Sequence, residues 1–197
     1  MYLNNDELRY CLDRAVEISE QYKLKHIASD DPRKSVDNLI VTCKDYLNKT
    51  VELAELAISK NDSSVWGSYI ALPDKYDICY VEDLNFCWKR FVICKEVFHV
   101  ILEKEDYKNM NLFEHIEQVT IVFPDNESHP SNSVACEWLA EIAAMEFMIP
   151  YDTRKKQIER YGENINYRDI AERFKVPLVL VEKYFSEQVM EVLSEFF

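Results

Sequence analysis

Glycine is nearly absent from this sequence, with only 2 Gly and 6 Pro among 197 residues. Glycine supplies the positive φ angles that tight turns need, so few positions suit a many-stranded β architecture. The sequence also lacks a glycine-rich loop of the kind that cradles phosphate groups. Hydrophobic residues nevertheless make up 48% of the chain, including 12 Tyr and 10 Phe. The composition therefore predicts a globular, mostly helical protein with one ample core.

Positive charge is also in short supply. The chain has 23 Lys and Arg against 36 Asp and Glu, which gives a formal net charge of −13. A surface this acidic repels nucleic acid and anionic membranes over about 8–10 Å at physiological salt. We therefore expect no direct nucleic-acid binding and no membrane binding. A basic peptide, or the basic face of another protein, is the partner that this charge favours.

One segment, IAERFKVPLVLVEKY, is similar to the core of a helix-turn-helix. A recognition helix normally presents Arg, Lys, Asn or Gln to the base edges. This segment offers aliphatic side chains from Leu178 to Val181, with Lys183 as the cation that follows them. We interpret it as a packing element rather than as a DNA reader.

Signals for export, membrane insertion and structural zinc are missing as well. The six cysteines form no C-x-x-C pair, so a zinc finger is not expected. The first residues, MYLNNDELRY, carry neither a basic region nor an apolar core of a signal peptide. No apolar run approaches the roughly 20 residues that span a bilayer. We expect a cytoplasmic protein with reduced thiols.

Residues 1–62 predict a helical N-terminal segment. A first helix, capped by Asn4 or Asn5, is expected to reach about Lys23. Its apolar stripe comprises Leu8, Cys11, Leu12, Ala15 and Val16. Asp31 and Pro32 suit the N-cap and the first position of a second helix.

Beyond that start, apolar residues recur at three- and four-residue steps from Val36 to Ile58. This period predicts one long helix, or two nearly continuous helices, that end near KNDSS. The stripe lacks strict heptad order, so we interpret it as a packing surface rather than a dimerisation coil.

Residues 63–197 predict an α+β domain with a helical C-terminal tail. VWGSYIAL and YDICYVE are rich in aromatic and β-branched residues and read as two strands of a hairpin or meander. A helix capped by Asp83 is expected over about 84–104, and QVTIVFP suits a third strand. A further helix, VACEWLAEIAAMEF, is closed by Pro150, and shorter helices follow, with Gly162 suited to end one and Pro177 to start another.

The helix over 84–104 carries Lys95-Glu96-Val97-Phe98-His99, where a zinc peptidase has His-Glu-x-x-His. Residues at i and i+4 project from one helix face, so two His side chains there can hold one Zn²⁺. The intervening Glu then acts as general base on the metal-bound water. In this chain Lys95 stands at the first ligand position, Glu96 at the base position and His99 at the second ligand position.

Two segments together resemble the ImmA/IrrE family of zincin-like metallopeptidases. KRFVICKEVFHVIL is similar to the motif helix of that family. The segment from Glu137 to Pro150 is similar to its second signature, with Ala140 and Ala144 at matching spacing. YRDIAERFKVPLVLVEKYF also resembles the family's ending. The resemblance implies a zincin-like fold, His99 and Glu137 as metal ligands, Glu96 as catalytic base, and regulation in phage, mobile-element or stress circuits.

Lys95 departs from the family pattern in the position that matters most. An amine with a pKa near 10.4 must lose its proton before it can bind zinc, and His99 with Glu137 gives two ligands where catalytic zinc has three. We expect a metal-free site in which the Lys95 ammonium lies between the carboxylates, so no cofactor is expected. Two alternatives remain: zinc held by a substituted ligand set, or a site completed by a partner or substrate.

Three other residues are candidate substitute ligands. His115 and His129 could each replace the missing imidazole, although a lone His is more often solvated or capped. Glu141, one turn after Glu137, is either a ligand, a support for one, or a surface charge.

We therefore expect a degenerate ImmA/IrrE-like protein that acts as a regulatory protein-binding module, and the replaced ligand leaves its peptidase activity open. One alternative is an active metal-dependent peptidase that cleaves a repressor-type protein with Glu96 as base. Another is an acidic binder that covers the basic surface of a DNA-binding partner. The sequence does not specify an oligomeric state.

Overall fold

A computed structural model describes residues 5–26, 32–59, 61, 65–102 and 132–197. Its helices and strands, in chain order, are α1 (Asn5–Lys25), α2 (Val36–Leu47), β1 (Thr50–Leu56), β2 (Gly67–Ala71), β3 (Lys75–Val81), α3 (Phe86–Leu102), α4 (Asn132–Met148), α5 (Tyr151–Tyr161), a 3-10 turn (Gly162–Asn164), α6 (Tyr167–Phe174), α7 (Leu178–Tyr184) and α8 (Glu187–Ser194). The chain is mostly helical with a small sheet, which confirms the predicted α+β class. None of the described helices is long and apolar enough to cross a bilayer.

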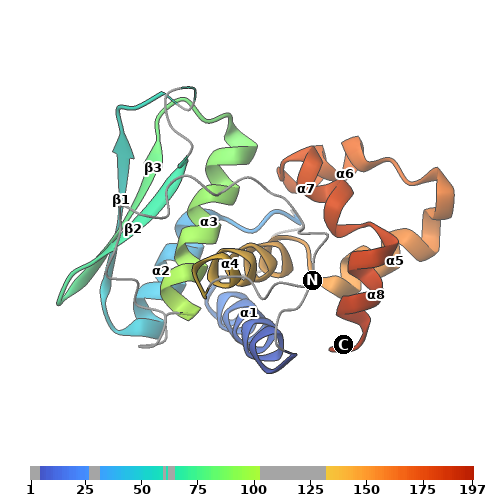
Figure 1. The fold of residues 1–197 in the computed structure, drawn as a ribbon, viewed down its shortest axis with the longest axis horizontal. Helices are drawn as coiled ribbons and strands as arrows, with labels where there is room; N and C mark the ends of the chain where they lie inside the picture. The colour runs from blue at the N-terminus through green and yellow to red at the C-terminus, as the bar shows by residue number, and fades with distance from the viewer. Residues whose placement is uncertain (1–4, 27–31, 60, 62–64, 103–131) are drawn as a thin grey trace.

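The sheet has the strand order β1-β3-β2, with β3 in the centre. The predicted hairpin is confirmed, because β2 and β3 pair antiparallel and Leu72 N donates to Lys75 O at 2.8 Å across the turn. β1 pairs with β3 in parallel, from Thr50 opposite Lys75 to Leu56 opposite Val81. α3 packs against β3 and β2, so the helix with the motif lies on the sheet (Figure 1).

The predicted continuation of the second helix to Ile58 is wrong, because residues 50–56 form β1. Leu, Ala and Glu in TVELAEL favour a helix locally, but pairing with β3 satisfies the backbone of the segment as a strand. Val51 is buried against the core, whereas Leu53 is half-exposed. The helix ends because Asn48 adopts the left-handed conformation, with φ 51°. The border expected after residue 62 falls between β1 and β2 of this one sheet.

Two predicted caps are also displaced. Helix α2 begins at Val36 with Ser35 as N-cap, whose hydroxyl accepts from Asn38 N at 3.3 Å, so Pro32 lies before the helix. Asp31 and the strand expected in QVTIVFP lie outside the described residues. In the same way, Asn85 caps α3 by accepting from Trp88 N at 3.0 Å. Asp83 instead accepts from Ser59 Oγ at 2.9 Å.

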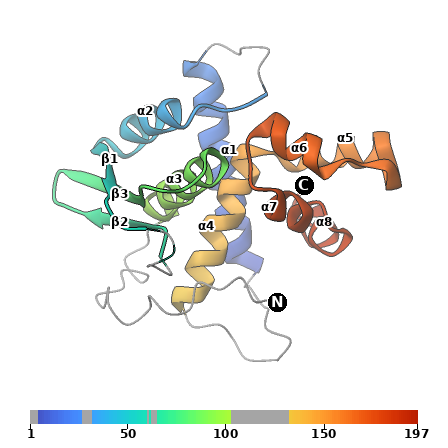
Figure 2. The ribbon, with the colours of Figure 1, turned by 90° about the horizontal axis from the view of Figure 1, so that it is seen from above.

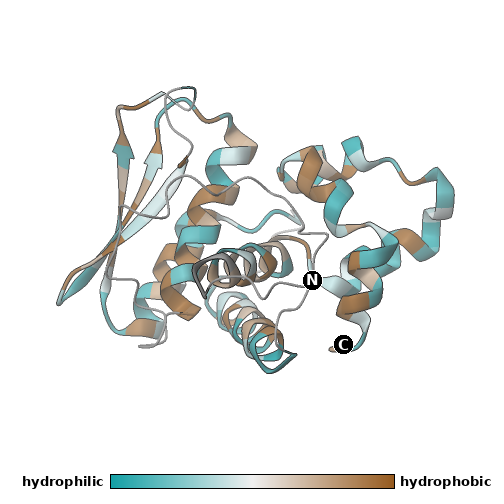
Figure 3. Cartoon of the chain, viewed as in Figure 1, coloured by the Kyte–Doolittle hydropathy of each residue, from teal (hydrophilic) through white to brown (hydrophobic). Residues whose placement is uncertain are grey.

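Helix α4 is the centre of the helical layer and packs against both α1 and α3 (Figure 2). Its sequence is apolar along most of its length, as the hydropathy colours of Figure 3 show. Ala140, Ala143 and Ala144 are fully buried, and such small side chains let neighbouring helices approach closely. Cys11 of α1 donates to Leu139 O at 3.0 Å. The first helix therefore belongs to the same core as the sheet.

Two arginines connect helices α5–α8 to this layer. Arg90 of α3 is buried and donates to Phe174 O and Lys175 O at 2.8 Å each, and to Lys34 O at 2.6 Å. Arg154 of α5 is fully buried and pairs with Glu146 of α4 at 2.5 Å. Buried cations are costly unless they are paired and hydrogen-bonded, so these contacts hold the C-terminal helices in one orientation.

Lys34 closes the C-terminal end of α4. Its Nζ donates to Phe147 O at 2.5 Å and to Ser19 Oγ at 3.0 Å, and it lies 4.1 Å from the centre of the Phe147 ring. A cation at a helix C-terminus is favourable because the last carbonyls carry negative partial charge. Burial opposes the charged form, however, and together with the nearby Lys23 it lowers the pKa of Lys34 from 10.5 to about 8.

This lowered pKa predicts that stability rises with pH between about 8 and 10.5. In that window the unfolded chain still holds the proton that folded Lys34 has lost, so the free energy of unfolding increases. We expect urea denaturation at several pH values to show this rise in the wild type. Across the window, the free energy of unfolding of the wild type should increase by about 2 kcal/mol more than that of Lys34→Met. Parallel curves for the two proteins would contradict the assignment.

Candidate functional site

Helices α3 and α4 bring the motif residues together. Asn85 sets the start of α3, and the apolar residues of the helix are buried between the sheet and α4. Val97 and Phe98 are fully buried, which fixes the rotation of the helix. Lys95 and His99, one turn apart, then face α4 at Glu137.

Four side chains meet there, and we call Lys95, Glu96, His99 and Glu137 the polar cluster. Lys95 Nζ lies 2.6 Å from Glu137 Oε2 and 3.5 Å from Glu96 Oε1. His99 Nε2 lies 3.2 Å from Glu137 Oε1. The ammonium and the imidazole thus share one carboxylate across the contact between two helices. The structure thus brings Lys95, Glu96, His99 and Glu137 together at one place.

The charges of the cluster support one another. Burial opposes the charged form of Lys95, but Glu96 and Glu137 outweigh it and hold the pKa of Lys95 above its ordinary value. Burial alone would raise the pKa of Glu137, yet His99 and Lys95 hold it well below its ordinary range. Lys95 is therefore an ammonium and Glu137 a carboxylate at neutral pH. A charge-assisted contact of this length is a strong one.

Strand β2 closes the cluster on the sheet side. The Tyr69 ring stacks on His99, with centroids 6.2 Å apart and planes at 22°. A Cβ added at Gly67 would lie 2.9 Å from Glu96 Oε1 and closer still to Val92. Glu96 is 3% exposed, so β2 confines its carboxylate directly. No motif in the sequence marks Gly67 and Tyr69 as site residues, although a glycine inside a strand is itself a signal of close approach.

The described residues do not fit a catalytic zinc. His99 Nε2 is buried and makes no well-aligned hydrogen bond to the described residues. A nitrogen that binds a metal would show the same two features. The neighbours of His99 Nε2, however, are one carboxylate and an ammonium, and an ammonium repels a metal cation. No group of three or more His, Cys, Asp or Glu side chains among the described residues is arranged to hold a metal.

The other candidate ligands are not part of the cluster as described. Glu141 turns towards α7, where its Oε1 lies 2.5 Å from Lys183 Nζ and accepts from Tyr184 OH at 3.0 Å. It is 8% exposed, so the reading of Glu141 as a surface charge is wrong. The helical period placed it on α4 but could not show which neighbouring helix it meets. His115 and His129 lie outside the described residues.

Gly67→Ala is expected to destabilise the protein, because the new methyl group forces Val92 and the Glu96 carboxylate to move. Overpacking of this kind costs about 1–3 kcal/mol. Chemical denaturation measures the loss, and Ile70→Val on the same strand, where Ile70 is 46% exposed, is the matched control with little change. Equal stability of the alanine variant and the wild type would show that β2 does not confine Glu96.

Glu137→Gln is expected to weaken the acid dependence of stability. The pKa of Glu137 lies below its ordinary value of 4.5 in the folded state, so its contribution is present above pH 4.5 and is lost as the pH falls below it. The Glu137 side chain is 37% exposed, so solvent screening limits the loss at pH 7 to about 1–2 kcal/mol.

Urea denaturation from pH 7 to pH 3 measures this difference. Glu172→Gln is the control, because Glu172 forms an ion pair with Lys175 while its side chain is 75% exposed. If both variants follow the wild-type pH profile, Glu137 makes no net contribution.

Comparison with known proteins agrees with this architecture. A model of the IrrE N-terminal-like domain, Peptidase_M78, matches residues 56–186, about two thirds of the chain. No curated protein matches the sequence. The matched range contains the β2–β3 hairpin, α3 with its motif, and α4 with Glu137. The resemblance to ImmA/IrrE proteins is therefore confirmed. This chain belongs to the IrrE N-terminal-like (Peptidase_M78) family and has its metallopeptidase fold.

Proposed function

We propose that this chain is a regulatory protein-binding module in which the metallopeptidase fold is retained and peptide hydrolysis is lost. The observation that carries the proposal is the 2.6 Å contact between Lys95 Nζ and Glu137 Oε2. The ammonium occupies the first ligand position of the motif and engages the carboxylate that the family resemblance assigns to the metal. Its positive charge links α3 to α4 through Glu137, as a bound cation would.

The protonation of Lys95 supports this proposal. Its pKa is held above its ordinary value, so binding zinc would require removal of a proton that both Glu96 and Glu137 stabilise. Glu96 is likewise 3.5 Å from the ammonium. A general base in this kind of site acts on a water that the bound metal has made more acidic. The described side chains do not form a set of ligands that would hold that metal.

Charge favours a basic partner. Within the polar cluster one ammonium faces two carboxylates, and the whole chain carries a formal net charge of −13. The acidic groups of the cluster favour the Lys and Arg side chains of a partner. In the phage or mobile-element circuits that the family suggests, such a partner is a basic regulatory protein.

A second candidate is an active peptidase in which a substituted ligand completes the site. It is favoured by His99 Nε2, a buried nitrogen turned towards Glu137 without a well-aligned hydrogen bond to the described residues. In this case the protein cleaves a repressor-type substrate with Glu96 as base. The two candidates differ in whether the purified wild type holds a metal.

Lys95→His is expected to create a zinc site, because it replaces the ammonium by an imidazole one turn from His99 and beside Glu137. Elemental analysis after exhaustive dialysis should give about one zinc per chain for the variant and less than about 0.1 for the wild type. The matched control is Lys89→His on the same helix, where Lys89 forms an ion pair with Glu55, and it should gain no zinc.

The wild type should also leave an unfolded basic protein uncut, with or without added zinc. Hydrolysis by the wild type that is abolished by a chelator and by Glu96→Gln would overturn the proposal in favour of the active peptidase. Failure of a folded Lys95→His variant to bind zinc would show that Lys95, His99 and Glu137 do not converge on one point.

A further inference from the structure

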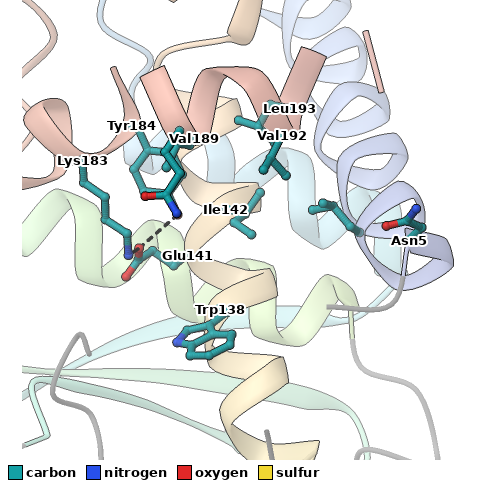
Figure 4. Close-up of a pocket in the computed structure, with 11 residues that line it drawn as sticks. Asn5, Trp138, Glu141, Ile142, Lys183, Tyr184, Val189, Val192 and Leu193 are labelled. Atoms are coloured by element: carbon teal, nitrogen blue, oxygen red, sulfur yellow. Dashed lines mark hydrogen bonds and ion pairs between the residues drawn. The ribbon is translucent and has the colours of Figure 1, made fainter. Parts of the chain in front are cut away.

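A hollow lies on the other side of α4 from the sheet, between the start of α1 and helices α7 and α8 (Figure 4). Leu8 of α1, Ile142 of α4 and Val189, Val192 and Leu193 of α8 form apolar walls. Its cavity volume is about 120 Å³. Engineered apolar cavities of roughly 150 Å³ hold one benzene-sized molecule, so the hollow suits a ligand of that size.

One end of the hollow is polar. Glu141 and Lys183 line it there, with their charged atoms 2.5 Å apart, and Tyr184 OH donates to Glu141 Oε1 at 3.0 Å. Both contacts use the same oxygen of Glu141, and its second oxygen, Oε2, makes no hydrogen bond to the described residues. A carboxylate oxygen beside apolar walls is an acceptor available to a ligand.

The charge of this end restricts the ligand. Glu141 and Lys183 form a balanced pair, so a head group that brings a further positive or negative charge leaves one charge without a partner in a largely apolar site. Placing such a charge there costs several kcal/mol, whereas a neutral hydrogen-bond donor meets Glu141 without that penalty. The apolar walls need an aliphatic or aromatic body of matching size.

We propose that this hollow is a binding site for a small neutral amphiphile, such as a medium-chain alcohol or a primary amide, whose apolar body lies between α4 and α8 and whose head group donates to Glu141. The site is separate from the polar cluster, because Glu137 faces α3 whereas Glu141 faces α7. Glu141 lies one turn of α4 after Glu137, so the ligand would contact the same helix that carries Glu137. The proposal does not depend on whether the chain is a peptidase.

Three probes of equal chain length test the head group: 1-hexanol, hexylammonium and hexanoate at pH 7. Methyl NMR shifts of Ile142, Val189, Val192 and Leu193 report binding at the hollow itself. We expect 1-hexanol to bind with a dissociation constant of about 1 mM, at least about tenfold more tightly than either ion. Methyl pentyl ether, which has the same size and no donor, should bind several-fold more weakly than 1-hexanol.

The variant Lys183→Met distinguishes a site that selects its ligand by the head group from a non-selective apolar hollow. It leaves Glu141 with an unbalanced negative charge, so hexylammonium should gain at least about tenfold relative to 1-hexanol. Lys89→Met, a lysine of α3 paired with Glu55, should keep the wild-type order of the probes.

Absence of methyl shifts up to about 10 mM, or equal binding of 1-hexanol and methyl pentyl ether, would overturn the proposal. An unchanged order of probes in folded Lys183→Met would do the same and would reduce the hollow to an adventitious apolar site. Should Lys183→Met fail to fold, the comparison of alcohol and ether in the wild type decides the question by itself.

Discussion

The contact between Lys95 and Glu137 is the interaction on which the organisation of the site depends. It joins α3 to α4 through a 2.6 Å ammonium–carboxylate contact, and residues 42 positions apart supply its two ends. Each charge would be costly alone at this largely buried position, so the pair is stable only while the two helices keep their spacing. His99 takes the other oxygen of Glu137 at 3.2 Å, and Tyr69 stacks on His99. Side chains from α3, α4 and β2 are thereby held together in one cluster.

Helix α4 gives that contact its surroundings. Its small residues, Ala140 and Ala144, are fully buried and allow α3 and α1 to approach closely. The side chains of Glu137, Glu141 and Glu146 point from α4 towards different neighbouring helices. Glu137 meets Lys95, Glu141 meets Lys183 of α7, and Glu146 meets Arg154 of α5. One helix thus supplies a carboxylate to three separate cations. This explains how a chain with a charge of −13 buries acidic residues without leaving them unpaired.

Much of this fold could be predicted from local sequence. The β2–β3 hairpin follows from two short aromatic and β-branched runs, and α3 follows from its continuous apolar run. The approach of Lys95 and His99 to the Glu137 carboxylate was expected from the i, i+4 spacing together with the resemblance that singled out Glu137. β1 was missed because TVELAEL has helical propensity and becomes a strand only against β3. Gly67 was missed because the need for a glycine there comes from α3, whose Val92 and Glu96 side chains pack against it.

The sequence by itself determined the mostly helical α+β class, the acidic surface, and a motif helix in which an amine replaces an imidazole. These properties depend on composition and on spacings of a few residues, which act within a single turn or strand. Only the tertiary structure decided that Glu141 is buried against Lys183 and that Arg90 holds α6 to α3. Such partners are 42 and 84 residues apart in the chain. Their meeting depends on how whole elements pack, and no local pattern specifies that.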